Sequence, residues 1–183
     1  LAGGDTFLPG PFLAAGTDPA LIPVINARTG STISTAPGTT PAPGVVDTAI
    51  HNLIGVEASG IGNHEWDLGS NVYQASITPG GGWVGAQYVS ISANLVLNPT
   101  PTVANSADPL NGRFTQTVGT GVLANEEAQD LRGRIAPSAV INEGGQTIGL
   151  VGVTTQILES ISSPTAAEIL GFPFGPGANG ETN

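Results

Sequence analysis

The residues best suited to chemistry lie within one stretch of five, Asn63-His64-Glu65-Trp66-Asp67. Amide and carboxylate oxygens are hard donors that suit divalent cations. A histidine beside a carboxylate can be held in one tautomer and act as an acid. By composition alone, this cluster fits a solvated loop as well as it fits a metal-dependent active site.

The net charge of the chain limits the classes of molecule that it is expected to bind. The 183 residues contain 4 cationic and 14 acidic side chains, which gives a formal net charge of −10. Nucleic acids and anionic membranes are bound through clustered Lys and Arg, so neither is expected as a partner. An acidic protein that handles phosphate esters needs a local positive charge, and bound metal ions supply one. No run of about 18 apolar residues is present, so no membrane span is expected.

Composition bears on the compartment and on the extent of the chain. Cysteine is absent, which excludes disulfides, thiolate chemistry and cysteine-based zinc sites. Methionine is absent too, so Leu1 is not expected to be a translation start, and we expect the chain to belong to something larger. Low charge with 27 glycines and 15 prolines favours an extracytoplasmic protein, either secreted, periplasmic or on the cell surface.

The elements that must position the cluster follow from the apolar pattern. Apolar residues at helical spacing predict a helix over 45–54, with His51 as a solvated histidine opposite the face of Ile50, Leu53 and Ile54. Residues 56–62 form a short, partly apolar strand that delivers the cluster into a loop. Open α/β sheets usually place their ligands after such strands.

Other segments complete the expected organisation. Residues 1–7 are predicted to form the end of a strand that continues into a loop. Residues 88–95 are predicted to form a second strand. Gly144-Gly145 between two apolar runs predicts a hairpin. Its second arm, 148–153, is apolar on both faces and predicts a central strand. The tract 28–44, rich in Thr, Ser, Pro and Gly, is expected to be a surface insertion without chemistry.

Several motifs resemble one family. Gly62-Asn63-His64-Glu65-Trp66-Asp67-Leu68-Gly69 resembles the Gly-Asn-His-Glu-aromatic-Asp-x-Gly signature of the calcineurin-like metallophosphoesterases, in the branch with 5'-nucleotidases and related secreted phosphatases. Gly3-Gly4-Asp5 resembles the upstream Gly-Gly-Asp block of that family. The stretches 92–95 and 148–155 are similar to the strands that follow its signature. The four blocks occur in the family's order.

The resemblance implies a fold and a set of roles. Residues 1–183 would form part of a metallophosphoesterase catalytic domain, an α/β fold of the four-layer αββα sandwich type. Two divalent metal ions would be its cofactors, with manganese, zinc, iron and calcium all as candidates. Asp5 would bridge the two ions and Asn63 would coordinate one of them. His64 would donate a proton or hydrogen bond to a phosphoryl or leaving-group oxygen, and Asp67 would orient its imidazole.

The implied activity is metal-dependent hydrolysis of small phosphorylated substrates, phosphomonoesters such as 5'-nucleotides. Phosphodiesters or pyrophosphates such as UDP-sugars are an alternative, as is a non-catalytic surface module with the same fold. The family's first Asp-x-His block and its later histidine ligands would lie outside 1–183, so this chain alone is expected to be inactive. Glu65 is expected to be structural, and Trp66 to pack behind the loop. The sequence does not indicate an oligomeric state.

Overall fold

A parallel sheet forms the centre of the computed structural model, which describes residues 1–97, 110, 112–115, 126–164, 167–171 and 175–176. Within the described residues, this sheet has three strands in the order β1 (Ala58–Gly60), β2 (Val89–Ile91) and β4 (Ile135–Ala136). Ser59 pairs with Ser90, and Ser90 with Ile135. A parallel bridge between Ala2 and Ser59 continues the sheet beyond β1. The chain is therefore mixed α/β, as predicted.

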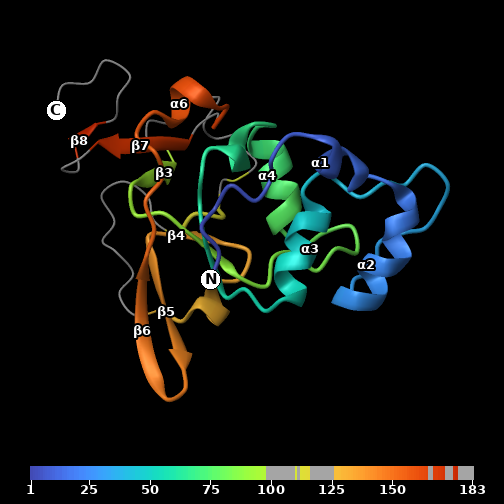
Figure 1. Cartoon of the computed structure of the whole chain (residues 1–183), viewed down its shortest axis with the longest axis horizontal. Coiled ribbons are helices and arrows are strands. Elements are labelled where there is room, and N and C mark those ends of the chain that lie inside the picture. The colour runs from blue at the N-terminus through green and yellow to red at the C-terminus, as the bar shows by residue number, and fades with distance from the viewer. Residues whose placement is uncertain (98–109, 111, 116–125, 165–166, 172–174, 177–183) are drawn as a thin grey trace.

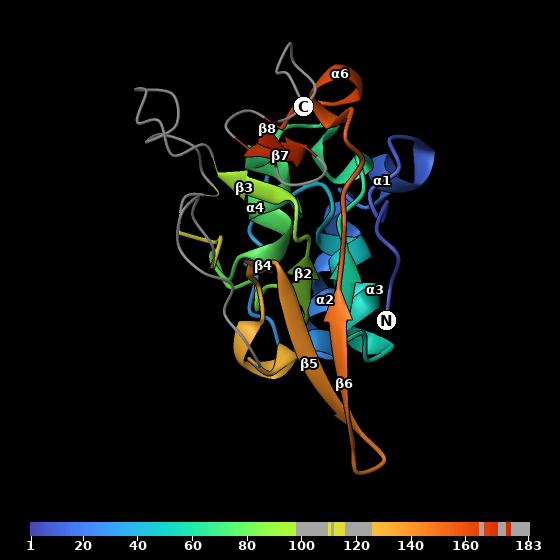
Figure 2. The same ribbon diagram turned by 90° about the vertical axis from the view of Figure 1, so that its left-hand side faces the viewer.

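Two antiparallel units adjoin this sheet. Strand β3 (Leu95–Leu97) pairs with β7 (Ala167–Gly171), which also pairs with β8 (Gly175–Pro176). Strands β5 (Ser138–Glu143) and β6 (Gln146–Val151) form the predicted hairpin. Figures 1 and 2 show this hairpin projecting from one end of the molecule, whereas β7 lies toward the opposite end.

The helices α1–α4 lie together on one side of the strands (Figure 1). Their bounds are α1 Pro11–Ala15, α2 Ile22–Thr29, α3 Val45–Leu53 and α4 Ser70–Ile77, and α6 (Leu158–Ile161) follows the hairpin. Short 3-10 turns span Pro19–Leu21 (η1), His64–Trp66 (η2) and Ala128–Leu131 (η3). No helix in the described part of the chain has the length and apolarity needed to cross a membrane.

The largest core cluster lies directly behind the turn η2. Trp66 is completely buried there, with its ring 5.2 Å from that of Tyr73 in an edge-to-face arrangement. Tyr73 makes a second such contact with Phe7, at 5.8 Å. Edge-to-face pairs are favoured by the charge distribution of aromatic rings. The expectation that Trp66 packs behind the loop is confirmed.

The helix predicted over 45–54 is present as α3, but its buried face differs from the expected one. Ile50, Leu53 and Ile54 are 41%, 52% and 70% exposed. The helix instead packs through its smaller side chains, including buried Thr48 and Ala49. His51 is half-buried: its ring lies 5.7 Å from that of Tyr88, and Nδ1 is 2.9 Å from the Asp47 carbonyl oxygen. The prediction of a solvated His51 is therefore wrong.

Two strand predictions also need correction. Within the described residues β6 pairs with β5 alone, and Val151 is 71% exposed, so β6 is not a central strand. An apolar run cannot by itself distinguish a central strand from an exposed one. The strand predicted over 88–95 is divided, because the chain leaves β2 after Ile91 and enters a different sheet at Leu95.

Part of the tract 28–44 is helical, because Arg28 and Thr29 form the end of α2. Gly30, in the left-handed region at φ 76°, terminates that helix. That the tract is an insertion stays a prediction. The stretch 98–112, where its prolines and asparagines predict a loop, falls mostly outside the described residues. Beyond Ser162, where the sequence has no periodic pattern, the structure contains β7 and β8.

Candidate active site

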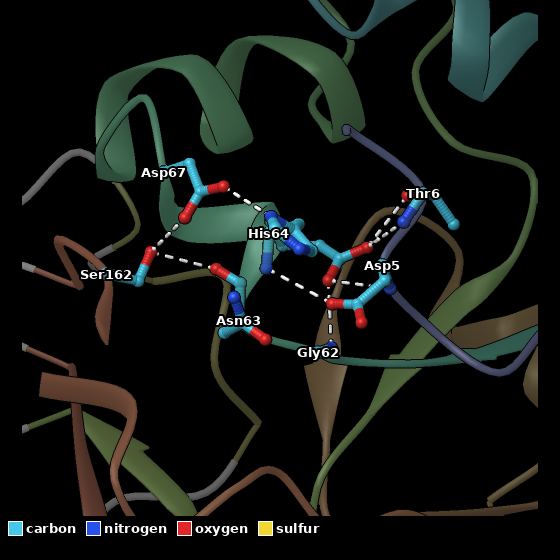
Figure 3. A network of polar contacts seen from close by, with 8 residues as sticks. Asp5, Thr6, Gly62, Asn63, His64, Asp67 and Ser162 are labelled. Atoms are coloured by element: carbon cyan, nitrogen blue, oxygen red, sulfur yellow. Dashed lines mark hydrogen bonds and ion pairs between the residues drawn. The ribbon is translucent and has the colours of Figure 1, made fainter. Parts of the chain in front are cut away.

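Two loops meet where neighbouring parallel segments end. The Ala2 N–H donates to the Ala58 carbonyl at 3.0 Å, and the Gly60 N–H donates to the Ala2 carbonyl at 2.9 Å. These bonds set the first segment beside β1 in the same direction. Asp5 lies three residues beyond Ala2, and Asn63 four residues beyond its bridge partner Ser59, so the two residues lie in adjacent loops (Figure 3). The carboxyl ends of parallel strands are the usual place for ligands in an α/β sheet.

The close approach of the two loops depends on glycine. A Cβ added at Gly60 would lie 2.9 Å from the Gly3 carbonyl oxygen, and one at Gly4 would lie 2.8 Å from the Gly62 nitrogen. A Cβ at Gly62 would overlap the Asp5 carboxylate. Asp5 itself has φ 54°, in the left-handed region that aspartate tolerates better than most residues. The two backbones are therefore packed without room for side chains.

The Asp5 carboxylate is held at this junction. Its Oδ1 accepts a hydrogen bond from the His64 N–H at 3.2 Å, as Figure 3 shows. Asp5 is an exposed residue, and Asn63 is partly buried. The structure thus brings the carboxylate predicted as a metal ligand to the residue that follows Asn63. That either residue binds metal stays a prediction.

Glu65 ties the two loops together. Its side chain is only 3% exposed. Oε1 accepts from the Thr6 N–H at 2.6 Å and the Thr6 hydroxyl at 2.8 Å. Oε2 accepts from the Asp5 N–H at 3.1 Å and the Gly62 N–H at 2.8 Å. One buried carboxylate therefore fixes the backbone on both sides of the junction.

The sequence contained a signal for only part of this role. Glu65 stands three residues after Gly62, and a glutamate can reach back over that spacing to a backbone N–H, as one does in a capping box. Here the N–H belongs to Gly62, one residue before the N-cap Asn63 of the turn η2. Its bonds to Asp5 and Thr6 cross about 60 positions of sequence. No local pattern indicates such contacts.

His64 and Asp67 form a short hydrogen bond on the turn η2. Nδ1 of His64 lies 2.5 Å from Oδ2 of Asp67, and the two side chains are 34% and 19% exposed. This hydrogen bond raises the pKa of His64 above its ordinary 6.5, while partial desolvation opposes the rise. The negative charges of Asp67, Asp5 and Glu65 raise it further. With Nδ1 directed at Asp67, Nε2 is the ring nitrogen left for a second partner.

Two hydroxyl groups that follow the β5–β6 hairpin in sequence also hydrogen-bond to this loop. The Ser162 hydroxyl oxygen lies 2.8 Å from the Asn63 carbonyl oxygen and 2.8 Å from Asp67 Oδ1 (Figure 3). The Thr154 hydroxyl donates to the Ile61 carbonyl at 2.8 Å. Both residues follow the hairpin, more than 90 positions beyond their partners. No local pattern in the sequence indicates a role for either hydroxyl.

A buried polar network anchors Thr154 to the sheet. Asn94 Oδ1 accepts from the Thr154 N–H at 2.8 Å, and Asn94 Nδ2 donates to the Thr154 carbonyl at 2.8 Å. The Ser92 hydroxyl lies 2.8 Å from the Thr154 hydroxyl and donates to Asn94 Oδ1 at 3.0 Å. All three side chains are at least nine-tenths buried. Paired polar groups of this kind hold one arrangement of the backbone.

Asp5 and Asn63 match a divalent cation in donor chemistry. A carboxylate and an amide oxygen are hard donors. Gly62, which lacks a Cβ, leaves the space that the Asp5 carboxylate occupies. Within the part of the chain that the structure describes, no three or more His, Asp or Glu side chains are grouped to hold a metal ion. The two residues would thus supply only part of a coordination shell.

No protein-family model matches this sequence, and no curated protein does. Among solved structures, it is similar to the 5'-nucleotidase precursor from Thermus thermophilus, with 25% identity and a TM-score of 0.48 over 72% of this chain. A second similar structure is the NAD nucleotidase of Haemophilus influenzae, with 16% identity and a TM-score of 0.41 over 68% of this chain. The matched region spans 19% and 18% of those chains, respectively.

Proposed function

We propose that this chain contributes part of the active site of a metal-dependent hydrolase that cleaves phosphate esters. The observation that carries the proposal is the meeting of Asp5 with the loop of Asn63, His64 and Asp67 at the ends of two parallel segments. Hard oxygen donors then stand beside a histidine paired with a carboxylate. Phosphoester hydrolysis needs both a centre of positive charge and a proton donor.

Asp5 and Asn63 would hold the metal ions in this proposal. When bound, such ions neutralise the phosphate and lower the pKa of an attacking water. The Asp5 carboxylate is already fixed by the His64 N–H, and its backbone by Glu65. These two hydrogen bonds direct the Asp5 carboxylate toward the loop of Asn63 and His64. The remaining ligands would come from parts of a longer protein outside residues 1–183, arranged as a four-layer αββα sandwich.

His64 would supply the proton. Asp67 occupies Nδ1, so that Nε2 is the atom from which a leaving-group or phosphoryl oxygen would receive it. The hydrogen bond to Asp67 raises the pKa of His64, which increases the protonated fraction near neutral pH. A side chain that is 34% exposed is also accessible to a substrate. A general acid requires both properties.

The substrates proposed are phosphomonoesters such as 5'-nucleotides, acted on outside the cytoplasm. The signature resemblance supports this choice of substrate, and the low content of charged residues supports the location. Diesters and UDP-sugar pyrophosphates need the same kind of centre, so they belong in the same assay. A non-catalytic module with this fold would show no turnover at all.

The test compares the 183-residue chain with a longer gene product that contains it. Both are stripped with a chelator, reloaded separately with manganese, zinc, iron or calcium, and assayed on 5'-nucleotides, a phosphodiester and a UDP-sugar. We expect metal-dependent turnover of the monoesters by the longer protein, and loss of bound metal in its Asp5→Ala variant. An Asp18→Ala variant, which changes another exposed aspartate, is the control. Absence of turnover with every metal and substrate would contradict the proposal.

A further inference from the structure

The Ser162 hydroxyl lies between two acceptors. It is 2.8 Å from the carbonyl oxygen of Asn63 and 2.8 Å from Oδ1 of Asp67. A serine hydroxyl carries one proton, and neither a carbonyl nor an ionised carboxylate donates. The proton can therefore serve one acceptor at a time. Whichever acceptor the proton serves, the hydroxyl lies next to the loop that carries His64.

The contact to Asp67 completes the hydrogen bonding of that carboxylate. Oδ2 faces His64 Nδ1 at 2.5 Å, and Oδ1 faces Ser162. A carboxylate held through one oxygen can rotate about its χ2 bond, whereas one held through both oxygens is fixed in plane. Figure 3 shows the Asp67 carboxylate between the serine on one side and the histidine on the other.

The Asn63 carbonyl, the other acceptor within reach of the Ser162 hydroxyl, belongs to the same turn. The Asn63 carbonyl also accepts the Trp66 N–H at 3.0 Å, which closes the turn η2. Ser162 thus touches the turn at the backbone of its first residue and at the side chain of Asp67. The serine comes from the end of α6, and its backbone is extended at φ −149° and ψ −168°. Segments far apart in sequence are joined at one hydroxyl.

We propose that Ser162 is a positioning residue that holds the Asp67 carboxylate in the plane where it fixes the His64 tautomer. Because an ionised carboxylate only accepts, Asp67 requires the proton on Nδ1 of His64, and neutral His64 then presents a bare Nε2. Loss of the hydroxyl frees Asp67 to turn away. The neutral imidazole then shifts toward the tautomer with its proton on Nε2. The link to turnover rests on the proposed function, but the tautomer itself does not.

The test uses ¹⁵N spectra of the two histidines in the 183-residue chain, at a pH well above the titration of His64. Ser162→Val and Ser162→Thr have matched shapes and differ in the hydroxyl, and the extended backbone accepts β-branched residues. In Ser162→Val we expect the ratio of Nδ1–H to Nε2–H tautomers of His64 to fall by about threefold or more, as expected for a weakened charge-assisted hydrogen bond. Ser162→Thr keeps the parental ratio.

The signals of His51, the other histidine, report on the rest of the fold. Ser163 is the exposed neighbour of Ser162, and Ser163→Ala is the control for a change in the same segment. If Ser162→Val leaves the His51 signals and the His64 ratio unchanged, the proposal is overturned. If both Val and Thr variants shift the ratio equally, shape rather than the hydroxyl is responsible, and the proposal is again overturned. Should Ser162→Val fail to fold, Ser162→Ala and Ser162→Thr give the same comparison.

Kinetics of the longer protein separate this proposal from the proposed function. If the longer protein hydrolyses phosphate esters, Ser162→Val should lower kcat by about tenfold, since removal of one orienting hydrogen bond costs a modest part of acid catalysis, with KM little changed. A tautomer shift without hydrolysis by any variant would refute the proposed function and leave the positioning role intact. Hydrolysis without a tautomer difference would refute the positioning role alone.

Discussion

The loop junction around Asp5 and His64 and the hairpin β5–β6 are held together in different ways. At the junction, buried side chains such as Glu65 and Thr154 bind backbone groups about 60 to 90 positions away. In the hairpin, six residue pairs follow one another in an antiparallel ladder, and β6 is largely exposed. The junction thus depends on individual side chains, whereas the hairpin depends on its backbone. Substitutions should therefore act very unequally in the two regions.

The largest effect is expected for catalysis. In a longer, active protein His64→Ala should lower kcat by about 10² to 10⁴, the usual span for lost acid catalysis, while metal content stays near the parental value. Ile148→Ala in the hairpin should leave kcat unchanged, since this side chain has no part in the proposed site and is 44% exposed. Steady-state kinetics and metal analysis measure both. A His64→Ala variant with parental turnover would remove His64 from the proposed mechanism.

Removal of the buried carboxylate should cause the largest loss of stability. Glu65→Ala leaves three backbone N–H groups and the Thr6 hydroxyl without their acceptor. Polar groups left without partners cost about 1–3 kcal/mol each when buried, and these four groups are partly buried, so the free energy of unfolding should fall by about 3 kcal/mol. Glu143→Ala, at the exposed end of β5, should change it by less than about 0.5 kcal/mol. Urea denaturation compares the two, and equal losses would refute the contrast.

Two glycines offer a matched pair for backbone packing. A Cβ at Gly62 would overlap the Asp5 carboxylate, whereas one at Gly149 in β6 meets no atom within 4 Å. Overpacking typically costs about 1–3 kcal/mol, so Gly62→Ala should destabilise by that amount. Gly149→Ala should be neutral or stabilising by up to about 1 kcal/mol, because alanine restricts the unfolded chain more. Thermal unfolding compares the two variants, and equal melting temperatures would show that the junction has room to spare.

The smallest effect concerns protonation. Asp67→Asn replaces the charged acceptor, whose hydrogen bond is the main cause of the raised pKa of His64, with a neutral amide, so that pKa should fall toward 6.5. A histidine with a raised pKa adds stability below its unfolded pKa, and this contribution is lost as pH rises through the folded value. Asp67→Asn should therefore lose more stability relative to the parent below pH 6.5 than above its folded midpoint. Urea denaturation of both proteins across this pH range measures the difference in stability, and NMR titration of His64 in the metal-free chain measures its midpoint. An unchanged His64 midpoint would contradict the prediction.

Local features were predictable and distant ones were not. The helix α3, the strand β1 and the β5–β6 hairpin follow from patterns within a few residues. The pairing of Asp67 with His64, three positions apart, was implied by the family resemblance of their motif. The place of Asp5 came from the resemblance of its block to a family rather than from any local pattern. The second contacts of the site could not be read from the sequence. Ser162 lies where the sequence has no periodic pattern, and Thr154 lies in the block 148–155, which indicates a strand but no contact with the loop. Only tertiary folding brings the two hydroxyls to the loop.

Burial was predicted less well than secondary structure. Ile50, Leu53 and Val151 belong to elements that were correctly located, yet all three are exposed. Hydrophobic periodicity tells which residues share a face, but the neighbouring elements decide whether that face is covered. On α3 the covered face is the one with Thr48 and Ala49, where small side chains permit close packing.

The crowded glycines have a consequence for any survey of every possible substitution. Gly4, Gly60 and Gly62 have no functional group, yet each would place a new Cβ within 3 Å of another chain atom. In such a survey, substitutions at these glycines would be tolerated as poorly as substitutions at His64. Intolerance to substitution at this junction would therefore mark where two backbones touch as well as where the proposed proton transfer takes place.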